Sequence, residues 1–445
     1  MSPPSPEPES AELLSVEDLQ EAWNLLVPSD RIESFRALER TDAEDLFLGL
    51  SAHDQAVLLL ALPANERRSW IRLLAPDDAA DLCQEVTSEE REELLQLLDD
   101  PTRKDVSGLL AYAEDDAGGL MNPRYARVRP EMSVDEAITY LRRQASEQTA
   151  SLPYAYVLDQ DQKLLGVVSL RGLFMGRPDQ RVQDVMQTDP VTVPEAMDQE
   201  DVSRLFATNR FMAFPVVDKE GRMKGIVTLD DIVDVVREEA TEDIQKIGGT
   251  AALDAPYLRL SLWEMIRKRG GWLAVLFLGE SLTATAMGYF EQEVARAVVL
   301  ALFVPLVISS GGNSGGQATT LVIRAMSLGE VRLRDWWHVM QRELMTGLAL
   351  GVLLATIGLI RILVWESVFH TYGPHHFMIA VAVAVSLVGV VLWGTLVGSM
   401  LPFLLRRLNF DPASASAPFV ATLVDVTGLV IYFTAAKVLL AGTLL

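Results

Sequence analysis

The stretch SSGGNSGGQATT occupies residues 309 to 320 and directly follows the apolar run VVLALFVPLVI, residues 298 to 308. Glycine and amide side chains are typical of surface turns, yet this stretch continues a segment that is apolar enough to lie in a membrane. Irregular backbone is tolerated at membrane depth only where it is buried in protein or lines a wet cavity. The stretch therefore predicts a place where helices approach closely or where water enters.

The C-terminal half contains five apolar segments long enough to cross about 30 Å of hydrocarbon. Basic residues cluster before the first segment (RKR, 267–269), after the second (324–342) and after the fourth (Arg406 and Arg407). By the positive-inside rule these sides are cytoplasmic, which puts the N-terminal half inside the cell and the C-terminus outside. The expected spans are Trp272–Phe290, Val294–Thr319, Met345–Trp365, Phe377–Leu404 and Ala417–Leu440.

Two acidic residues, Asp425 and Glu280, fall within these spans. A charge at mid-membrane costs about 2.5 kcal/mol or more, so it should face a bundle interior, a cavity or a cation. For Asp425 we favour a role in a cation pathway over a protonated carboxyl group that hydrogen-bonds to another helix. For Glu280 the sequence supports these two interpretations equally. Asn313 and Gln317 share one helical face, which fits either a cavity lining or amide hydrogen bonds between packed helices.

The net charge of −23 lies entirely in the first 270 residues, because the remainder holds nine acidic and nine basic side chains. Such an acidic half repels nucleic acid and attracts cations, so we expect no nucleic-acid partner. The single cysteine, Cys83, excludes a disulfide framework and a cysteine-based metal site. The polar start MSPPSPEPES predicts a disordered tail at residues 1–10 without a cleavable signal, which keeps the acidic half in the cytoplasm.

Residues 121 to 236 contain an internal repeat. In each copy, short β-branched runs alternate with amphipathic stretches in the order strand, helix, strand, glycine turn, strand, helix. Gly166 of the first copy corresponds to Gly225 of the second, and Ser169 corresponds to Thr228. The pattern resembles a tandem pair of CBS domains.

CBS pairs commonly bind adenine nucleotides through a [Ser/Thr]-x-x-Asp corner whose carboxylate holds the ribose. The second copy keeps this corner as Thr228-Leu-Asp-Asp231, whereas the first copy reads Ser169-Leu-Arg-Gly172 and lacks the acid. The resemblance therefore implies, at most, one complete nucleotide corner.

The first part of the chain, residues 11 to 115, is rich in Leu and Glu at helical spacing and is interrupted by breaks such as VPSD and LAPDD. This predicts a small all-α superhelical domain whose acids fit a solvated surface. The stretch DDIVDVVREEATEDI, residues 230 to 244, differs because it concentrates acids on about four helical turns with one arginine. Such acids repel other acids across an interface unless divalent cations bridge them.

Four stretches point to one family: GGNSGGQATTLVIRAMSLGE (311–330), LPFLLRRLNFDPASASAPFVATLVDVTGLVIYF (401–433), EDDAGGLMNP (114–123) and EATEDIQKIGG (239–249). In these motifs and in its domain order, the chain closely resembles the MgtE family of magnesium channels and transporters. The resemblance implies a multidomain homodimer in a lipid bilayer. The implied parts are the tail at 1–10, an all-α N-terminal superhelical domain at 11–120, the α/β CBS domains at 121–183 and 184–241, a long connecting plug helix at 242–270 and an α-helical transmembrane domain of five spans at 271–445.

The resemblance implies a Mg²⁺-selective channel or transporter of the bacterial inner (plasma) membrane, not an enzyme, with a pore between the second and fifth spans. Asp425 would hold a largely hydrated Mg²⁺ with help from the carbonyl of Ala421, since this cation prefers oxygen ligands and dehydrates reluctantly. Asn313, Gln317 and Gly428 would line the pore. Regulatory Mg²⁺ would close it by binding among Asp45, Asp77, Asp81, Asp198, Glu200, Asp231, Asp234, Glu239, Glu242, Asp243 and Asp411.

ATP is a further ligand that the resemblance implies, with Arg171, Phe211 and Asp231 as the candidate contacts. Two positions depart from the family pattern. Arg210 stands where some relatives carry an acid, which weakens one regulatory site, and Ala417 stands where many carry Asn, which alters the pore mouth.

Two other functions stay open on the sequence alone. One is a membrane-anchored CBS sensor of nucleotides or cations that does not conduct, and the other is a broader divalent transporter for Mn²⁺, Co²⁺ or Zn²⁺. Gly172 argues against nucleotide sensing, and an acid at position 425 argues against a mere anchor. An outer loop carries three histidines that could bind a softer metal: His370, His375 and His376. We favour the interpretation that they are ordinary surface residues.

Overall fold

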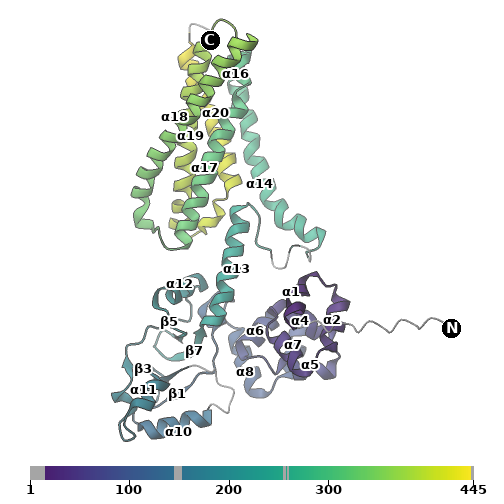
Figure 1. The fold of residues 1–445 in the computed structure, drawn as a ribbon, viewed down its shortest axis with the longest axis vertical. Helices are drawn as coiled ribbons and strands as arrows, with labels where there is room; N and C mark the ends of the chain where they lie inside the picture. The colour runs from purple at the N-terminus through teal and green to yellow at the C-terminus, as the bar shows by residue number, and fades with distance from the viewer. Residues whose placement is uncertain (1–15, 145–152, 254–256, 258–259, 442–445) are drawn as a thin grey trace, which may run out of the picture. The chain divides into compact units, whose positions relative to one another are not determined.

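The structure is a computed structural model that describes residues 16–144, 153–253, 257 and 260–441 (Figure 1). The chain divides into two compact units, Met1–Arg237 and Glu238–Leu445, and each is described by itself. The tail predicted for residues 1–10 lies outside the described residues.

The first unit begins with short helices: α1 (Val16–Ala22), η1 (Trp23–Leu25), α2 (Pro28–Ala37), α3 (Arg40–Leu48), α4 (Ala52–Ala61), α5 (Ala64–Ile71), α6 (Pro76–Gln84), α7 (Ser88–Leu97), α8 (Asp100–Leu109) and α9 (Ala117–Leu120). Their starts carry clear local signals. Thr87 and Glu90 form a capping box before α7, Asp99 caps α8, and prolines open α2 and α6. These residues satisfy or remove the unpaired N–H groups of a first helical turn. The apolar faces then meet in one core.

Two small sheets follow, one for each copy of the repeat. Their elements are β1 (Arg127–Val128), α10 (Val134–Gln144), β2 (Tyr154–Leu158), β3 (Leu164–Ser169), α11 (Leu170–Met175), η2 (Val182–Asp184), β4 (Gln187–Thr188), β5 (Val193–Pro194), α12 (Gln199–Asn209), β6 (Ala213–Val217) and β7 (Met223–Thr228). The strand orders are β1-β2-β3-β4 and β5-β6-β7. The two copies share one register, because Gly166 pairs with Val157 and Gly225 pairs with Val216.

The repeat glycines have the same packing role in both copies. A Cβ atom placed on Gly166 would lie 2.6 Å from the carbonyl oxygen of Gln187, and one on Gly225 would lie 2.7 Å from that of Asn122. Each glycine therefore lets the neighbouring chain approach the antiparallel hairpin closely. The correspondence of these two positions, predicted from the sequence, holds in the fold.

The second unit consists of long helices: α14 (Leu262–Tyr289), α15 (Glu291–Arg296), α16 (Val298–Ala301), α17 (Val304–Ser327), η3 (Leu333–Asp335), α18 (Trp336–Phe369), α19 (His376–Arg407), η4 (Pro412–Ser414) and α20 (Ala417–Leu440). Among the described residues, five helical stretches are long and apolar enough to cross a membrane, and each overlaps one predicted span. Helices α17 to α20 pack against one another, and α14 packs against α20 (Figure 1).

The connecting helix differs from the prediction of a plug helix at 242–270. Helix α13 (Leu229–Ile247) begins earlier, within the predicted second CBS domain, and ends at Gly248 and Gly249. Gly249 has a φ of +74°, a left-handed conformation that stops a helix and that glycine adopts without strain. Helix α14 begins only at Leu262, after a capping box formed by Ser261 and Glu264. Residues 242–270 are therefore not one helix.

Candidate functional site

The glycine-rich stretch does not break its helix, since α17 runs continuously from Val304 to Ser327. Its glycines instead form two faces without side chains, one next to α20 and one next to α19. Gly312 and Gly316 face α20: Cβ atoms placed on them would lie 3.4 Å from the Cβ atoms of Ala421 and Ala417, respectively. Because glycines and alanines repeat every four residues on both helices, the two backbones come close together.

Gly311 and Gly315 form the second face and pack against α19. A Cβ atom on Gly315 would lie 2.8 Å from the carbonyl oxygen of Gly394, and one on Gly398 would overlap the carbonyl oxygen of Gly315. Beside them the hydroxyl groups of Ser314 and Thr395 lie 2.7 Å apart and hydrogen-bond to each other. Polar groups on this face are thus satisfied inside the subunit.

Asn313 and Gln317 lie on a third face of α17, where both are exposed in the single chain. The Asn313 amide donates a long hydrogen bond of 3.4 Å to the hydroxyl of Ser309, one turn earlier. Within the single chain, the glycines and Ser314 make the helix-packing contacts of α17, and the role of the two amides stays a prediction.

Asp425 lies half-buried on α20, beside the first glycine face. A Cβ atom on Gly312 would lie 3.6 Å from Oδ1 of Asp425, and Ala421 precedes Asp425 by one helical turn. The carbonyl of Ala421 belongs to the helical ladder and keeps a second lone pair for another ligand. Helix α14 meets α20 at this level too, since a Cβ atom on Gly279 would lie 2.9 Å from Cγ2 of Thr422.

Gly428, which we predicted to line the pore, lies close to α19 in the single chain. It is buried, and a Cβ atom on it would lie 3.1 Å from Cγ1 of Val390 on α19. Within the single chain Gly428 packs against α19, and its place along the pore stays a prediction.

A group of acids collects in the first unit around Asp77 of α6. Asp77 is buried, and its Oδ1 accepts a hydrogen bond of 3.1 Å from the amide of Asn122. Burial, together with the negative charges of Asp78, Asp231 and Asp81, raises the pKa of Asp77 to about 8. Four neighbouring carboxyl groups carry the charge and the oxygen donors that an added divalent ion would need.

Asp231 of α13 belongs to the same group. Its Oδ2 accepts hydrogen bonds from the backbone N–H of Thr228, at 3.2 Å, and from the Thr228 hydroxyl, at 2.5 Å. Burial raises the pKa of Asp231 to about 6 in spite of these bonds. No three acidic, histidine or cysteine side chains in the described part of the chain are arranged to hold a metal ion, so the group is not gathered into a finished site.

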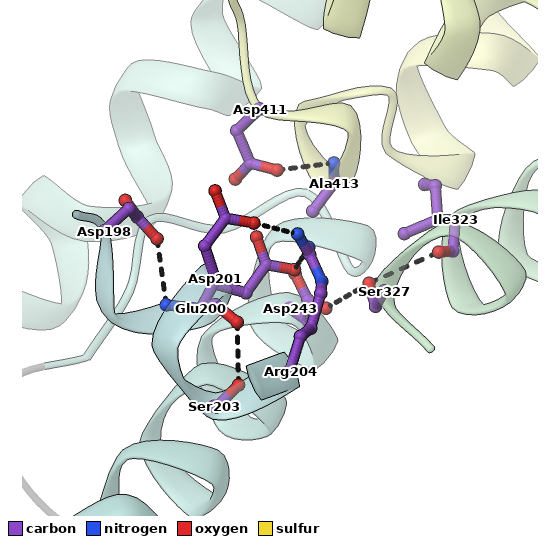
Figure 2. A network of polar contacts seen from close by, with 10 residues as sticks. All are labelled: Asp198, Glu200, Asp201, Ser203, Arg204, Asp243, Ile323, Ser327, Asp411 and Ala413. Atoms are coloured by element: carbon purple, nitrogen blue, oxygen red, sulfur yellow. Dashed lines mark hydrogen bonds and ion pairs between the residues drawn. The ribbon is translucent and has the colours of Figure 1, made fainter. Parts of the chain in front are cut away.

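A second group of acids lies in the second unit, where α13 ends. The Ser327 hydroxyl of α17 donates to Asp243 at 2.8 Å, and Oδ1 of Asp411 accepts from the backbone N–H of Ala413 at 2.8 Å (Figure 2). Lys246 forms ion pairs with Glu242 and, at 2.7 Å, with Oδ2 of Asp411. Burial alone would lower the pKa of Lys246, but its bonds to these two carboxylates raise it.

Known protein families match the N-terminal, CBS and transmembrane regions of the chain. Residues 304–435 match a family model described as a divalent cation transporter, residues 14–115 match the MgtE intracellular N domain, and residues 117–176 and 182–238 match the CBS domain. The magnesium transporter MgtE of Thermus thermophilus is 43% identical over 367 residues, which cover 82% of this chain and 79% of that protein. The chain belongs to the MgtE family.

Two further matches are a second transporter and a solved cytosolic domain. The magnesium transporter MgtE of Bacillus subtilis is 33% identical over 80% of this chain and 77% of its own length. A crystal structure of the cytosolic domain of the Mg²⁺ channel MgtE in complex with ATP is 40% identical, with a TM-score of 0.46, and covers 49% of this chain and 90% of that one. Family membership confirms the predicted architecture of a helical N domain, a tandem CBS pair and a multi-pass membrane domain of five apolar helices.

The remaining acids that resemblance to the MgtE family singled out are scattered or already paired. Asp198 caps α12 by accepting from the N–H of Glu200 at 2.9 Å, and Glu200 forms an ion pair with Arg204 (Figure 2). Asp45 is exposed on α3, Asp234 is exposed and lies 3.7 Å from Arg237, and Glu239 is half-buried. As ion ligands these residues stay predictions.

The nucleotide corner of the second CBS copy is formed, and that of the first copy is incomplete. In the first copy the Ser169 hydroxyl accepts from the N–H of Gly172 at 2.9 Å, which keeps the turn without a carboxylate. Phe211 is 37% exposed next to the second corner and packs edge-on against Phe214, whereas Arg171 is exposed beside the incomplete one.

The sequence missed several neighbours of these sites. Asn122 falls within the motif EDDAGGLMNP, and Lys246 lies two residues beyond the acidic stretch 230–244. The spacing of Glu242 and Lys246, four residues apart, could have indicated their pairing on one helical face.

Proposed function

We propose that this chain transports Mg²⁺ across the bacterial inner membrane along a pathway walled by α17 and α20. The observation that carries the proposal is the half-buried Asp425, which lies at the glycine face of α17, one turn beyond Ala421. The carboxylate is only half-buried, so it can meet an ion that keeps its water shell, and it supplies the negative charge that the ion needs. The exposed amides of Asn313 and Gln317 would bind that water.

A second copy of the chain would complete the pathway. In the single chain, Asn313 and Gln317 are exposed, and none of the described residues of α14 is buried although the helix is apolar. Exposed polar groups at membrane depth are costly unless they face water or protein. A homodimer in which two α17–α20 walls face each other would enclose them. The N-terminus would be cytoplasmic, because Arg324, Arg406 and Arg407 follow the ends of the second and fourth spans.

We propose that cytosolic Mg²⁺ closes the pathway by binding the acids around Asp77 and Asp231. Their mutual repulsion disfavours a compact arrangement until a divalent ion neutralises them, so Mg²⁺ would bind the closed state more tightly than the open one. ATP would bind at the Thr228–Asp231 corner. The outer histidines give no support to a softer metal, since Nδ1 of His376 lies 2.9 Å from the carbonyl oxygen of Gly373 and no third ligand joins them among the described residues.

Substitution of Asp425 by alanine tests the transport proposal. We expect Asp425→Ala to lose Mg²⁺ flux in liposomes and to fail to complement a bacterium deficient in Mg²⁺ uptake, while it elutes from size-exclusion chromatography like the parent. Glu330→Gln, at an exposed acid after α17, is the matched control and should transport normally. Normal flux through Asp425→Ala would refute the assignment of the pathway.

Titration of Mg²⁺ on the cytosolic side tests the gating proposal. In the parent, flux should fall as Mg²⁺ rises, and the double variant Asp231→Asn with Asp234→Asn should need more Mg²⁺ for the same inhibition. An unchanged inhibition midpoint in that variant would contradict closure through these acids and would leave the transport proposal intact.

A further inference from the structure

The end of α13 is held to the connection between α19 and α20 by a lysine. Lys246 lies in the last turn of α13, and its ammonium group is 2.7 Å from Oδ2 of Asp411 while it also pairs with Glu242, one turn earlier. All three side chains belong to the second unit. The side chain of Lys246 is 29% exposed, and those of Glu242 and Asp411 are 36% and 37% exposed.

The resemblance to the MgtE family implied a Mg²⁺ ion between Asp411 and the acids of this helix. The residues present do not fit that ion, because an ammonium group already contacts the oxygens that the ion would need. A Mg²⁺ ion requires a nearly octahedral shell of oxygens and could enter here only after Lys246 had left.

The two carboxylate oxygens of Asp411 accept hydrogen bonds from different parts of the chain. Oδ1 accepts from the N–H of Ala413 at the start of η4, and Oδ2 accepts from Lys246. The first bond fixes the carboxylate on the α19–α20 connection, and the second ties that connection to α13. Ile247, the next residue of α13, packs in a small apolar cluster with Ile323, Ala413 and Ala415.

We propose that Lys246 is a built-in cation that bridges Glu242 and Asp411 and holds the end of α13 in place without a divalent ion. A charge carried by the chain is present at every Mg²⁺ concentration, unlike a bound ion. Asp243 is also in place without a metal, because the Ser327 hydroxyl donates to it. At low Mg²⁺, this junction therefore stays closed while the acids around Asp77 and Asp231 lose their ions.

The consequence for gating rests on the proposed function. If Mg²⁺ closes the pathway, the lysine supplies part of the closure that does not depend on Mg²⁺. Removal of the ammonium group leaves Glu242, Asp243 and Asp411 without their cation. These carboxylates then repel one another at low Mg²⁺, and they also become free to bind Mg²⁺ in the place of the lysine.

The labelling rate of a cysteine under this junction tests the proposal without any measurement of transport. Ala413 is 1% exposed, so Ala413→Cys in a Cys83→Ala background gives a single thiol that a maleimide reaches when the end of α13 moves away. In EDTA, Lys246→Gln should label about fivefold faster than the parent, which is what loss of two half-exposed ion pairs predicts. Lys246→Arg keeps the charge and should label like the parent.

Two further measurements separate a bridge from a general loss of structure. Mg²⁺ should slow labelling of Lys246→Gln to the rate of the parent, because the freed carboxylates accept the ion. The double variant Lys246→Gln with Asp411→Asn should label no faster than Lys246→Gln alone in EDTA, since both changes break one bridge. Equal labelling of Lys246→Gln and the parent in EDTA would overturn the proposal, as would equally fast labelling of Lys246→Arg. Neither result depends on whether Asp425 conducts.

Discussion

Asp425 and Gly312 face each other across the contact between α20 and α17, where a Cβ atom on Gly312 would lie 3.6 Å from the carboxylate oxygen Oδ1. This is an ordinary van der Waals distance, so the two backbones tolerate a methyl group at position 312. The same methyl group would occupy space that the proposed pathway gives to the water shell of the ion. A small substitution at Gly312 should therefore leave folding unchanged but reduce Mg²⁺ transport.

We expect Gly312→Ala to fold normally and to lower Mg²⁺ flux several-fold, and Gly312→Leu to abolish flux because its side chain fills the space beside Asp425. Flux into liposomes measures the effect, and elution volume reports folding. Gly288→Ala on α14 is the control, since nothing lies within 4 Å of a Cβ atom there. Full transport by Gly312→Leu would show that the ion passes elsewhere.

At Gly398, in the contact between α17 and α19, we expect an added methyl group to lower stability. A Cβ atom on Gly398 would overlap the backbone carbonyl of Gly315, which cannot move without the helix. Alanine is the better helix former by about 1 kcal/mol, but an overlap in a packed interface costs about 1–3 kcal/mol or more, so the steric effect wins. We expect Gly398→Ala to lower the thermal midpoint of the detergent-solubilised protein.

Gly270→Ala, at a helical position with nothing within 4 Å, provides the comparison and should leave the midpoint unchanged or slightly raised. A midpoint for Gly398→Ala equal to that of Gly270→Ala would mean that α17 and α19 can separate without loss. The pair of variants thus measures the contact and not the general effect of a methyl group on a helix.

The role of the glycine-rich stretch was only partly predictable from the sequence. Close helix approach follows from small residues four apart, and the exposed face follows from the spacing of Asn313 and Gln317. The division of GGNSGG into one face toward α20 and another toward α19 depends on which helices lie on each side. That arrangement is a property of the packed bundle, and so is the contact of Gly428 with Val390 of α19.

The acidic clusters show a similar limit. The sequence marked Asp77 and Asp231 through resemblance, but their proximity brings together α6 and α13, which are far apart in the chain. Local spacing could indicate the pairing of Glu242 with Lys246, and it could not indicate that Asp411 completes the bridge. The end of α13 at Gly248 and Gly249 was visible as a glycine pair, yet the expected plug helix ran through it.

The unequal corners of the two CBS copies predict the stoichiometry of nucleotide binding. Asp231 provides a carboxylate beside Thr228, whereas Gly172 leaves the first corner with only the Ser169 hydroxyl. Calorimetric titration of the full chain with ATP should therefore give no more than one site per chain. Asp231→Asn should weaken that site about tenfold or more, because hydrogen bonds to a charged group are worth about 1.5–3 kcal/mol.

The neighbouring variant Asp230→Asn controls for a general change of charge on α13 and should retain ATP binding. Two sites per chain would contradict the interpretation of Gly172. Unaltered binding by Asp231→Asn would place the nucleotide away from the corner, and neither result would affect the ion pathway.

The buried acid Asp77 predicts how the stability of the first unit depends on pH. Its pKa is raised from the usual 3.8 to about 8, so between these values the folded chain holds a proton that the unfolded chain releases. Stability from this group is therefore complete below about pH 4 and is lost as the pH rises toward 8. Asp77→Asn keeps the shape without the titration, so its thermal midpoint should fall less than that of the parent between pH 5.5 and about pH 8.5.

Mg²⁺ should counteract this loss in the parent, since the ion neutralises the carboxylates that become charged at high pH. We expect the midpoint of the parent to rise by several degrees with Mg²⁺ at pH 8 and by less at pH 5.5, and that of Asp77→Asn to rise less at both. Asp42→Asn, at an exposed acid of α3, should behave like the parent. A Mg²⁺ response of Asp77→Asn equal to that of the parent would show that the ion binds to other acids.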